Sequence, residues 1–182
     1  MKYTRKKLEE TYDATQDEFL FFWGHQPTKD GSISNSCFSQ WWGASFTVNE
    51  KKYLTAEHWM MAQKALLFDD NEIFEEILST ELPKEVKKLG RLVKNFDPTI
   101  WNEKKYEIVL KGNIEKFSQN ESLKNHLLST NDKIIVEASP YDRIWGIGMS
   151  KGNTKCQDPK TWRGQNLLGF ALMETRDIIV KN

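Results

Sequence analysis

The chain has 182 residues, with 26 Lys and Arg, 26 Asp and Glu, and a formal net charge of zero. This length is sufficient for one domain with a sizeable core, and the charge balance excludes the overall basic field typical of proteins that bind nucleic acid or anionic membranes. Aromatic residues make up 12% of the chain, and several of the 7 Trp stand beside Gly, Asp or Asn. This pattern indicates a pocket for flat rings.

The cysteines and histidines give no sign of a metal or disulfide framework. Cys37 and Cys156 lie far apart and belong to no C-x-x-C motif, and the histidines at 25, 58 and 126 lack the spacing of metal ligands. No run of about eighteen apolar residues occurs, and the first residues contain no apolar core of a signal peptide. We therefore expect a cytoplasmic protein that uses no metal, no cofactor and no membrane.

The first third of the chain predicts an extension followed by short strands. Residues 1–18 are mostly charged and are expected to form an N-terminal extension, either a helix packed on the domain or a frayed tail. Residues 19–23 are an aromatic run that predicts a buried strand ended by Gly24. Two short strands at 45–48 and 52–54 flank the sequence N-E-K and predict a hairpin.

The sequence T-A-E-H-W-M-M-A-Q-K-A over residues 55–65 predicts a helix that carries an acid and an amine. Thr55 can accept a hydrogen bond as its N-cap, so Glu57 falls in the first turn, where the helix dipole favours negative charge. Lys64 follows seven residues later, about two turns, and therefore projects from nearly the same face. The apolar neighbours favour a buried helix, although both charges could also lie on a solvated surface.

Apolar residues at helical spacing predict a block of helices between residues 71 and 128. Gly90 and Arg91 are expected to interrupt the second helix of this block. Asp97 and Pro98 provide an N-cap and a first helical residue for the next helix.

The last third of the chain predicts a strand, a functional loop and a final helix. Residues 134–136 are apolar and β-branched, and they lead into E-A-S-P-Y-D-R-I-W-G-I-G over 137–148, whose glycines permit close approach of a ligand. The sequence W-R-G-Q-N then begins the last helix. The fold class predicted from these elements is α+β, a single compact domain with a small β-sheet surrounded by several α-helices.

Polar residues that could carry chemistry form three groups: Glu57 with Lys64, Gly90 with Arg91, and Glu137 with Asp142. If they converge, the carboxylates can act as acid and base at a sugar carbon, and the arginine can bind a phosphate. Each also has an ordinary explanation. Arg91 could be a surface residue, Glu137 could be a solvated strand end, and Asp142 could be a turn residue that bonds its own backbone.

Four motifs in order, T-A-E-H-W-M-M-A-Q-K-A, L-G-R, V-E-A-S-P-Y-D-R-I-W-G-I-G and W-R-G-Q-N-L-L-G-F-A-L-M, resemble the NADAR family, which includes the YbiA-like N-glycosidases of riboflavin biosynthesis intermediates. The resemblance runs from about Phe19 to Ile179 and implies that residues 19–182 form an N-glycosidase domain. It implies that the substrate is a ribosylamine phosphate of the early riboflavin pathway. The alternative within the family is ADP-ribose attached to guanine, as a nucleoside or in ADP-ribosylated nucleic acid.

Residue by residue, the resemblance implies that Glu57, Lys64 and Asp142 are catalytic. It implies an aromatic pocket at Trp23, Trp41 and Trp145, and we interpret Arg91 and Asn166 as phosphate or ribose contacts. The predicted substrate-binding set is Trp23, Trp41, Arg91, Trp101, Glu137, Trp145, Gly146 and Asn166. Residues 1–18 match no motif of the family.

Two mechanisms fit these residues. In the first, the neutral amine of Lys64, desolvated by Trp59, Met60 and Met61, attacks the opened ribosylamine and forms a Schiff base.

In the second, Glu57 or Asp142 activates water for direct attack, and Lys64 only binds phosphate. A competing hypothesis is a non-catalytic module that binds ADP-ribose or another nucleotide. Such a module has no need for an acid and an amine on one helix face.

Overall fold

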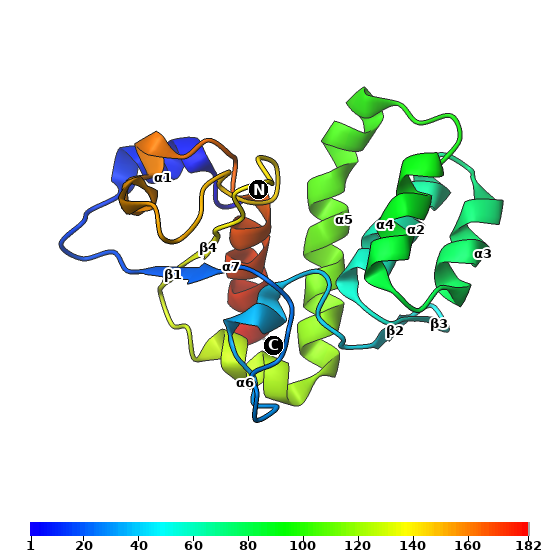
Figure 1. The fold of residues 1–182 in the computed structure, drawn as a ribbon, viewed down its shortest axis with the longest axis horizontal. Helices are drawn as coiled ribbons and strands as arrows, with labels where there is room; N and C mark the ends of the chain where they lie inside the picture. Colours follow the sequence, from blue (N-terminus) through cyan, green and yellow to red (C-terminus); the bar gives the residue numbers. More distant parts are fainter. Residues whose placement is uncertain (182) are drawn as a thin grey trace. The chain divides into compact units, whose positions relative to one another are not determined.

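The computed structural model describes residues 1–181, which divide into two compact units (Figure 1). Unit 1 comprises Met1–Ser39 and Ser122–Asn182, and unit 2 comprises Gln40–Glu121. Each unit contains one two-stranded sheet together with helices, so the predicted α+β class is confirmed. The four strands form two separate sheets, the parallel pair in unit 1 and the hairpin in unit 2.

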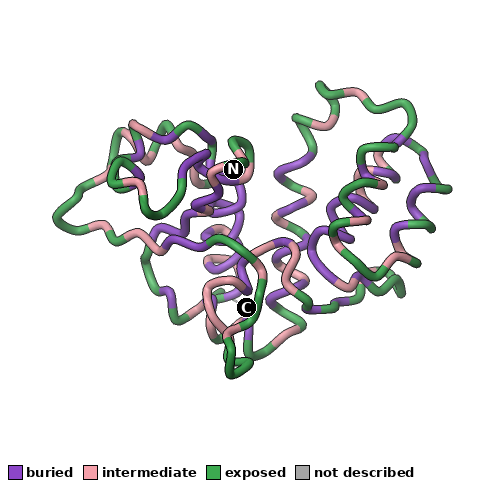
Figure 2. The backbone as a smooth tube through the Cα atoms, in the orientation of Figure 1, coloured by how far each residue is buried: buried purple, intermediate pink, exposed green. Residues whose placement is uncertain are grey.

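Unit 1 is built on a parallel pair of strands. In β1 (Phe19–Phe22) and β4 (Ile134–Glu137) the register runs from Phe19 opposite Ile134 to Phe22 opposite Glu137. The first three residues of β4 are buried, as expected for a parallel strand with both faces covered. Helix α7 (Leu167–Val180) packs against β4, and Figure 2 shows this strand and helix as largely buried.

The remaining helices of unit 1 are short. They are α1 (Arg5–Thr11), α6 (Glu121–Leu128), which begins at the last residue of unit 2, and three 3₁₀ helices, η1 (Asn35–Phe38), η2 (Thr154–Gln157) and η3 (Pro159–Thr161).

The N-terminal segment is attached to η3 and the loop that follows it. Thr4 caps α1 by accepting from the backbone N–H of Lys7, and the Arg5 guanidinium donates to the carbonyl oxygens of Lys160 and Gly164. After the helix, the ring of Tyr12 stacks on Phe19 with 5.0 Å between centroids. These contacts hold residues 1–12 against the rest of unit 1.

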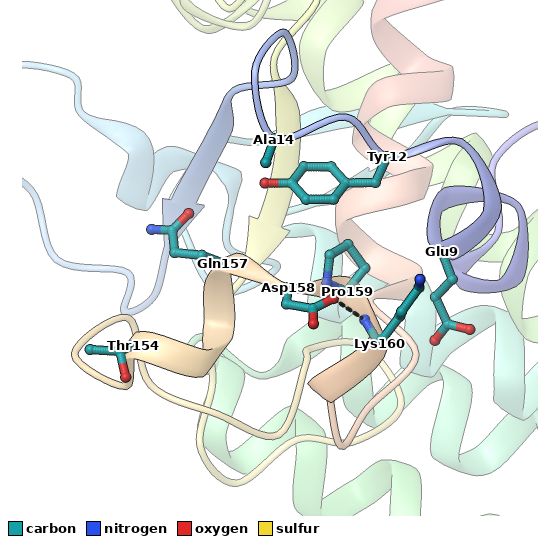
Figure 3. A pocket seen from close by; sticks show the side chains of 8 residues that line it. All are labelled: Glu9, Tyr12, Ala14, Thr154, Gln157, Asp158, Pro159 and Lys160. Carbon is teal, nitrogen blue, oxygen red and sulfur yellow. Dashed lines mark hydrogen bonds between the residues drawn. The ribbon is translucent and has the colours of Figure 1, made fainter.

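A shallow pocket of about 420 Å³ lies beside this segment. Figure 3 shows residues of the N-terminal segment on one side and residues of η2 and η3 on the other, with the Asp158 carboxylate accepting from the backbone N–H of Lys160. The lining residues are Glu9, Tyr12, Ala14, Thr154, Gln157, Asp158, Pro159 and Lys160. None of the predicted site residues lines this pocket.

Unit 2 is organised around α2 (Ala56–Leu67), which packs against α3 (Asn71–Ser79), α4 (Pro83–Leu92) and α5 (Pro98–Gln119). Most residues of α2 are buried, which confirms the predicted buried helix (Figure 2). A helix can be buried on several sides in this way when apolar residues surround most of its circumference.

The predicted hairpin is confirmed as β2 (Phe46–Val48) and β3 (Lys51–Tyr53). Its two turn residues, Asn49 and Glu50, both have positive φ, as a type I′ turn requires. The side-chain amide of Gln119 in α5 accepts from the Thr47 N–H and donates to the Thr47 carbonyl, and so replaces a neighbouring strand.

The prediction that Gly90 and Arg91 interrupt a helix is wrong, because α4 continues through both to Leu92. Gly90 is instead a point of close contact between α4 and Met61 of α2. A Cβ atom there would lie 2.0 Å from the Met61 sulfur and 2.8 Å from its Cγ. The glycine therefore supports helix packing and does not break the helix.

No helix in the part of the chain that the structure describes is both long and apolar enough to cross a membrane.

Gly169 in α7 gives a testable prediction for unit 1. A Cβ at this position would lie 2.1 Å from the carbonyl oxygen of Ile135 in β4, and this backbone atom cannot rotate away. We expect Gly169→Ala to lower the free energy of unfolding by about 1–3 kcal/mol, measured by urea denaturation. Gly152→Ala is the matched control, since only the Ser150 hydroxyl approaches within 4.0 Å. Equal stability of the two variants would contradict this close packing.

Candidate functional site

Glu57 lies in the first turn of α2. Thr55 is the N-cap, with its hydroxyl accepting from the backbone N–H of His58, and the Glu57 N–H donates to the Gln40 carbonyl at 2.9 Å. The Glu57 side chain is only 3% exposed. The alternative in which Glu57 lies on a solvated surface is therefore wrong, and the helix N-terminus favours a negative charge at this position.

Gln40 connects Glu57 to the long helix of unit 2. Its side-chain amide donates to the Asn113 carbonyl oxygen at 3.1 Å, and the Asn113 amide donates to the Val109 carbonyl within α5. All of these polar groups are buried. Because a buried amide with unmet hydrogen bonds is costly, this network fixes the segment that carries Trp41.

Lys64 lies two turns further along α2, and its amine faces aromatic rings contributed by other elements. The Nζ atom lies 4.0 Å from the centroid of the Phe96 ring and 5.8 Å from that of Trp101, and it donates to the Gly90 carbonyl at 2.6 Å. Burial lowers the pKa of Lys64 below its usual value of 10.5. A lowered pKa increases the fraction of neutral, nucleophilic amine near neutral pH.

The predicted neighbours of this amine were only partly correct. The sequence placed Trp59, Met60 and Met61 around it, but the Trp59 indole donates to the Ile108 carbonyl and packs on Tyr53. Phe96 and Trp101 supply the rings instead. Phe96 lies one residue before the N-cap Asp97, and Trp101 lies four residues after it. This spacing is that of a hydrophobic staple, and it is the sequence signal that could have identified Phe96.

Two other predicted residues of unit 2 lie at less buried positions. Arg91 is exposed in the last turn of α4, next to the Gly90 carbonyl that binds Lys64. Trp41 is partly exposed, and the Lys87 amine lies 5.7 Å from its ring centroid. The structure thus brings Lys64, Trp101 and the backbone before Arg91 together.

In unit 1, Asp142 organises the loop after β4. The Asp142 Oδ1 atom accepts from the N–H groups of Ile144 at 2.8 Å and Trp145 at 2.7 Å, and the buried Ser139 hydroxyl accepts from the N–H of Asp142. The turn role that the sequence left open for Asp142 is therefore present. Its second carboxylate oxygen lies on a partly exposed side chain, so a chemical role remains available.

Gly146 lies where this loop returns to the sheet. A Cβ atom there would lie 2.8 Å from the carbonyl oxygen of Glu137 and 3.1 Å from that of Asp142. The glycine is thus required by contact with the protein backbone, and its predicted contact with substrate stays a prediction.

Asn166 joins the last helix to β4. It has a left-handed backbone with φ of 56°, and its side chain is fully buried. Its Oδ1 accepts from the Glu137 N–H and its Nδ2 donates to the Ile135 carbonyl, each at 3.0 Å. Both polar atoms of the amide are thus engaged with backbone. The structure gives Asn166 a structural role, and the predicted phosphate or ribose contact gains no support.

Four residues that the sequence patterns do not single out take part in these contacts: Gln40, Phe96, Ser139 and Tyr141. Tyr141 is 87% exposed, and its ring lies 6.3 Å from that of Trp23, which is 59% exposed. No group of three or more His, Cys, Asp or Glu residues with metal-binding geometry occurs within residues 1–181.

Comparison with known proteins identifies the family. The sequence model of the NADAR domain matches residues 21–180. The chain belongs to the NADAR family. A protein of Acanthamoeba polyphaga mimivirus, named N-glycosidase R617, is 44% identical over 170 residues, covering 88% of this chain and 96% of that protein. The resemblance that the sequence motifs indicated is confirmed.

Two further relatives extend this assignment. Escherichia coli N-glycosidase YbiA is 32% identical over 167 residues, covering 89% of this chain and 89% of that protein. The NMR structure of E. coli YbiA superimposes on this chain with a TM-score of 0.71 and 27% identity, covering 91% of this chain and 87% of that chain. A maize protein named riboflavin biosynthesis protein PYRR, chloroplastic, is 32% identical over 133 residues, covering 69% of this chain and 20% of that protein. The prediction of an enzyme of the N-glycosidase class is confirmed by these NADAR relatives.

The environment of Lys64 gives a prediction about pH. Reductive ¹³C-methylation of the lysines followed by an NMR titration should place the pKa of Lys64 below 10.5. In Phe96→Ala, water reaches the amine, so we expect its pKa to rise towards 10.5, even though the lost ring also removes a contact that favours the ammonium. An unchanged or lower pKa in this variant would show that burial under Phe96 is not the cause.

Proposed function

We propose that this N-glycosidase hydrolyses ribosylamine phosphates, in which the anomeric carbon of a phosphorylated ribose is bonded to the amine of a flat heterocycle. The observation that carries the proposal is the Lys64 amine, half-buried under Phe96 and Trp101 with a lowered pKa. A relative named for riboflavin biosynthesis supports this substrate class. The chain matches only a fifth of that relative, so the support concerns the shared NADAR region.

The proposed reaction begins with opening of the ribose ring, which converts the C–N bond to an imine. The neutral Lys64 amine then adds to this carbon, and the heterocyclic amine leaves with a proton, so that a Schiff base joins Lys64 to the sugar. Water adds to the Schiff base, the carbon–lysine bond breaks, and the free amine of Lys64 is regenerated. The net reaction consumes one water and requires no oxidant or reductant.

Glu57 is the proposed acid and base of this sequence. It protonates the departing nitrogen and later accepts a proton from the attacking water. Glu57 is buried in the first turn of α2, where the helix dipole favours the carboxylate form that accepts a proton.

The Schiff base has a direct test. The purified protein is incubated separately with riboflavin-pathway ribosylamine phosphates and with ADP-ribosylated guanosine, each with and without borohydride, and products and intact protein are analysed by mass spectrometry. We expect cleavage of the ribosylamine phosphate and a reduced sugar adduct on the peptide that contains Lys64. In Lys64→Met the adduct and turnover are expected to be lost.

Lys111→Met is the matched control for this test. The Lys111 amine lies 5.6 Å from the centroid of the Trp59 ring but is exposed to water, and both adduct and turnover should remain. Turnover without any adduct on Lys64 would exclude the Schiff base in favour of direct attack by water, with Glu57 or Asp142 as the base. Cleavage of ADP-ribosylated guanosine alone would assign the other substrate class of the family.

The role of Glu57 is tested by Glu57→Gln, which keeps the size of the side chain but cannot exchange protons. We expect kcat to fall by about 10²–10⁴-fold, as is typical for loss of a general acid or base, with circular dichroism unchanged. Glu72→Gln is the control, since Glu72 is also a first-turn acid but is exposed. Near-normal turnover of Glu57→Gln would mean that the acid lies elsewhere.

A further inference from the structure

Asp70 is a buried carboxylate in unit 2 that has no part in the proposed reaction steps. It lies in the turn that joins α2 to α3 and is only 5% exposed. Its Oδ1 atom accepts from the Ile73 N–H at 3.3 Å, as the N-cap of α3. Its Oδ2 atom accepts from the Lys94 N–H at 2.8 Å, 24 residues further along the chain. An N-cap needs one acceptor, so capping does not account for the second bond.

The bond from Lys94 also keeps Asp70 in its charged form. Hydrogen bonding from the Lys94 N–H is the main cause that holds the pKa of the Asp70 carboxyl below its usual value of 3.8. The side chain is therefore a carboxylate at neutral pH, with both oxygens available as acceptors. Hydrogen bonds to an ionised acceptor are stronger than those between neutral groups, which makes this a firm attachment between two distant parts of the chain.

Lys94 belongs to residues 93–97, which we call the connecting segment because it joins α4 to α5 (Figure 1). The segment forms no regular helix or strand, and Asn95 within it has a φ of 55°. Its position therefore depends on bonds to neighbouring elements. The Lys94 amine also pairs with the Glu72 carboxylate at 2.7 Å, but both side chains are exposed, and exposed pairs contribute little.

The connecting segment carries Phe96, whose ring lies between Phe68 and the Lys64 amine. The Phe96 ring packs edge-to-face on Phe68 with 5.3 Å between centroids, and its own centroid lies 4.0 Å from the Lys64 Nζ. Phe68 precedes Asp70 by two residues, and Phe96 follows Lys94 by two, so the turn after α2 contacts the segment through both a backbone bond and a ring pair. Since Phe96 is 42% exposed, it is not enclosed by a core, and its place over the amine depends on these contacts.

We propose that Asp70 is a positioning residue for the reaction at Lys64. By binding the Lys94 N–H, its Oδ2 atom holds the connecting segment so that the Phe96 ring lies over the amine. The effect on turnover rests on the proposed function, in which this amine attacks the sugar carbon. The Gly90 carbonyl accepts from the same nitrogen, so ring and carbonyl together restrict where the nucleophile lies. Misplacement of a reacting group by about 1 Å can cost about 100-fold in rate.

The test uses Asp70→Ser, which keeps an acceptor for the cap of α3 but has no second oxygen for the Lys94 N–H. Protein labelled with ¹³C-lysine gives NMR signals of the Lys64 Cε methylene group, assigned by their loss in Lys64→Met. An aromatic face close to these protons shifts them upfield, so the shift reports where Phe96 lies. We expect an upfield shift in the wild type that is lost in Phe96→Leu and in Asp70→Ser.

Turnover is measured on the same variants with the substrate that the wild type cleaves. In Asp70→Ser, kcat should fall by about 10- to 100-fold. The double variant Asp70→Ser/Phe96→Leu separates positioning from a general loss of stability. If Asp70 acts through Phe96, adding Asp70→Ser to Phe96→Leu should change neither the Lys64 shift nor kcat any further.

Glu72→Gln is the matched control, because it breaks the exposed ion pair to the Lys94 amine and leaves the bond from the Lys94 N–H to Asp70 in place. This variant should keep the Lys64 shift and kcat of the wild type. All variants are compared under conditions in which circular dichroism shows folded protein. Asp70→Thr, which also keeps a single capping oxygen, replaces Asp70→Ser if that variant does not fold.

Three results would overturn the proposal while the N-glycosidase reaction stands. They are an upfield shift of Lys64 that persists in Asp70→Ser, a lost shift with unchanged kcat, and an equal fall in kcat whether or not Phe96 is present. Failure of the proposed function gives a different result, in which the wild type cleaves neither ribosylamine phosphates nor ADP-ribosylated guanosine. The Lys64 shift then decides alone: its loss in Asp70→Ser supports the positioning of Phe96 by Asp70, and its persistence overturns it.

Discussion

The close approach of α4 to α2 at Gly90 is the contact on which the surroundings of Lys64 depend. The missing side chain allows Met61 to fill the space, and the same residue offers its carbonyl to the Lys64 amine. Burial at this place lowers the pKa of Lys64. One backbone position thus contributes both to the packing of the helices and to the hydrogen bonding of the lysine.

Unit 1 follows the same rule with different residues. The buried amide of Asn166 bonds both an N–H and a carbonyl of β4, and Gly169 lets α7 lie directly on that strand. Because both polar atoms of the buried Asn166 amide have backbone partners, this side chain fixes the start of α7 against β4. The Ser139 and Asp142 hydrogen bonds extend this order into the loop, so that Tyr141 is displayed on a fixed backbone.

Much of this organisation could be predicted from local sequence signals. Thr55 and Asp97 are N-caps as predicted, and the hairpin and the buried strand at 134–136 form where the pattern placed them. The prediction for Gly90 is wrong, because the sequence alone does not distinguish a glycine that breaks a helix from one that allows another helix to pack closely. Phe96 and Tyr141 were missed, since one lies outside any helix and the other follows a proline in a polar loop.

The sequence by itself determined the α+β class, the family and the motifs that carry Glu57, Lys64 and Asp142, because these depend on residue type, order and spacing along the chain. Only the tertiary structure decided which side chains surround each of them. Trp101 of α5 and Phe96, just before this helix, lie close to the Lys64 amine. The Asn166 side chain forms hydrogen bonds with the backbone of β4. Burial and hydrogen-bond partners depend on distances between segments far apart in the chain, which spacing along one segment does not specify.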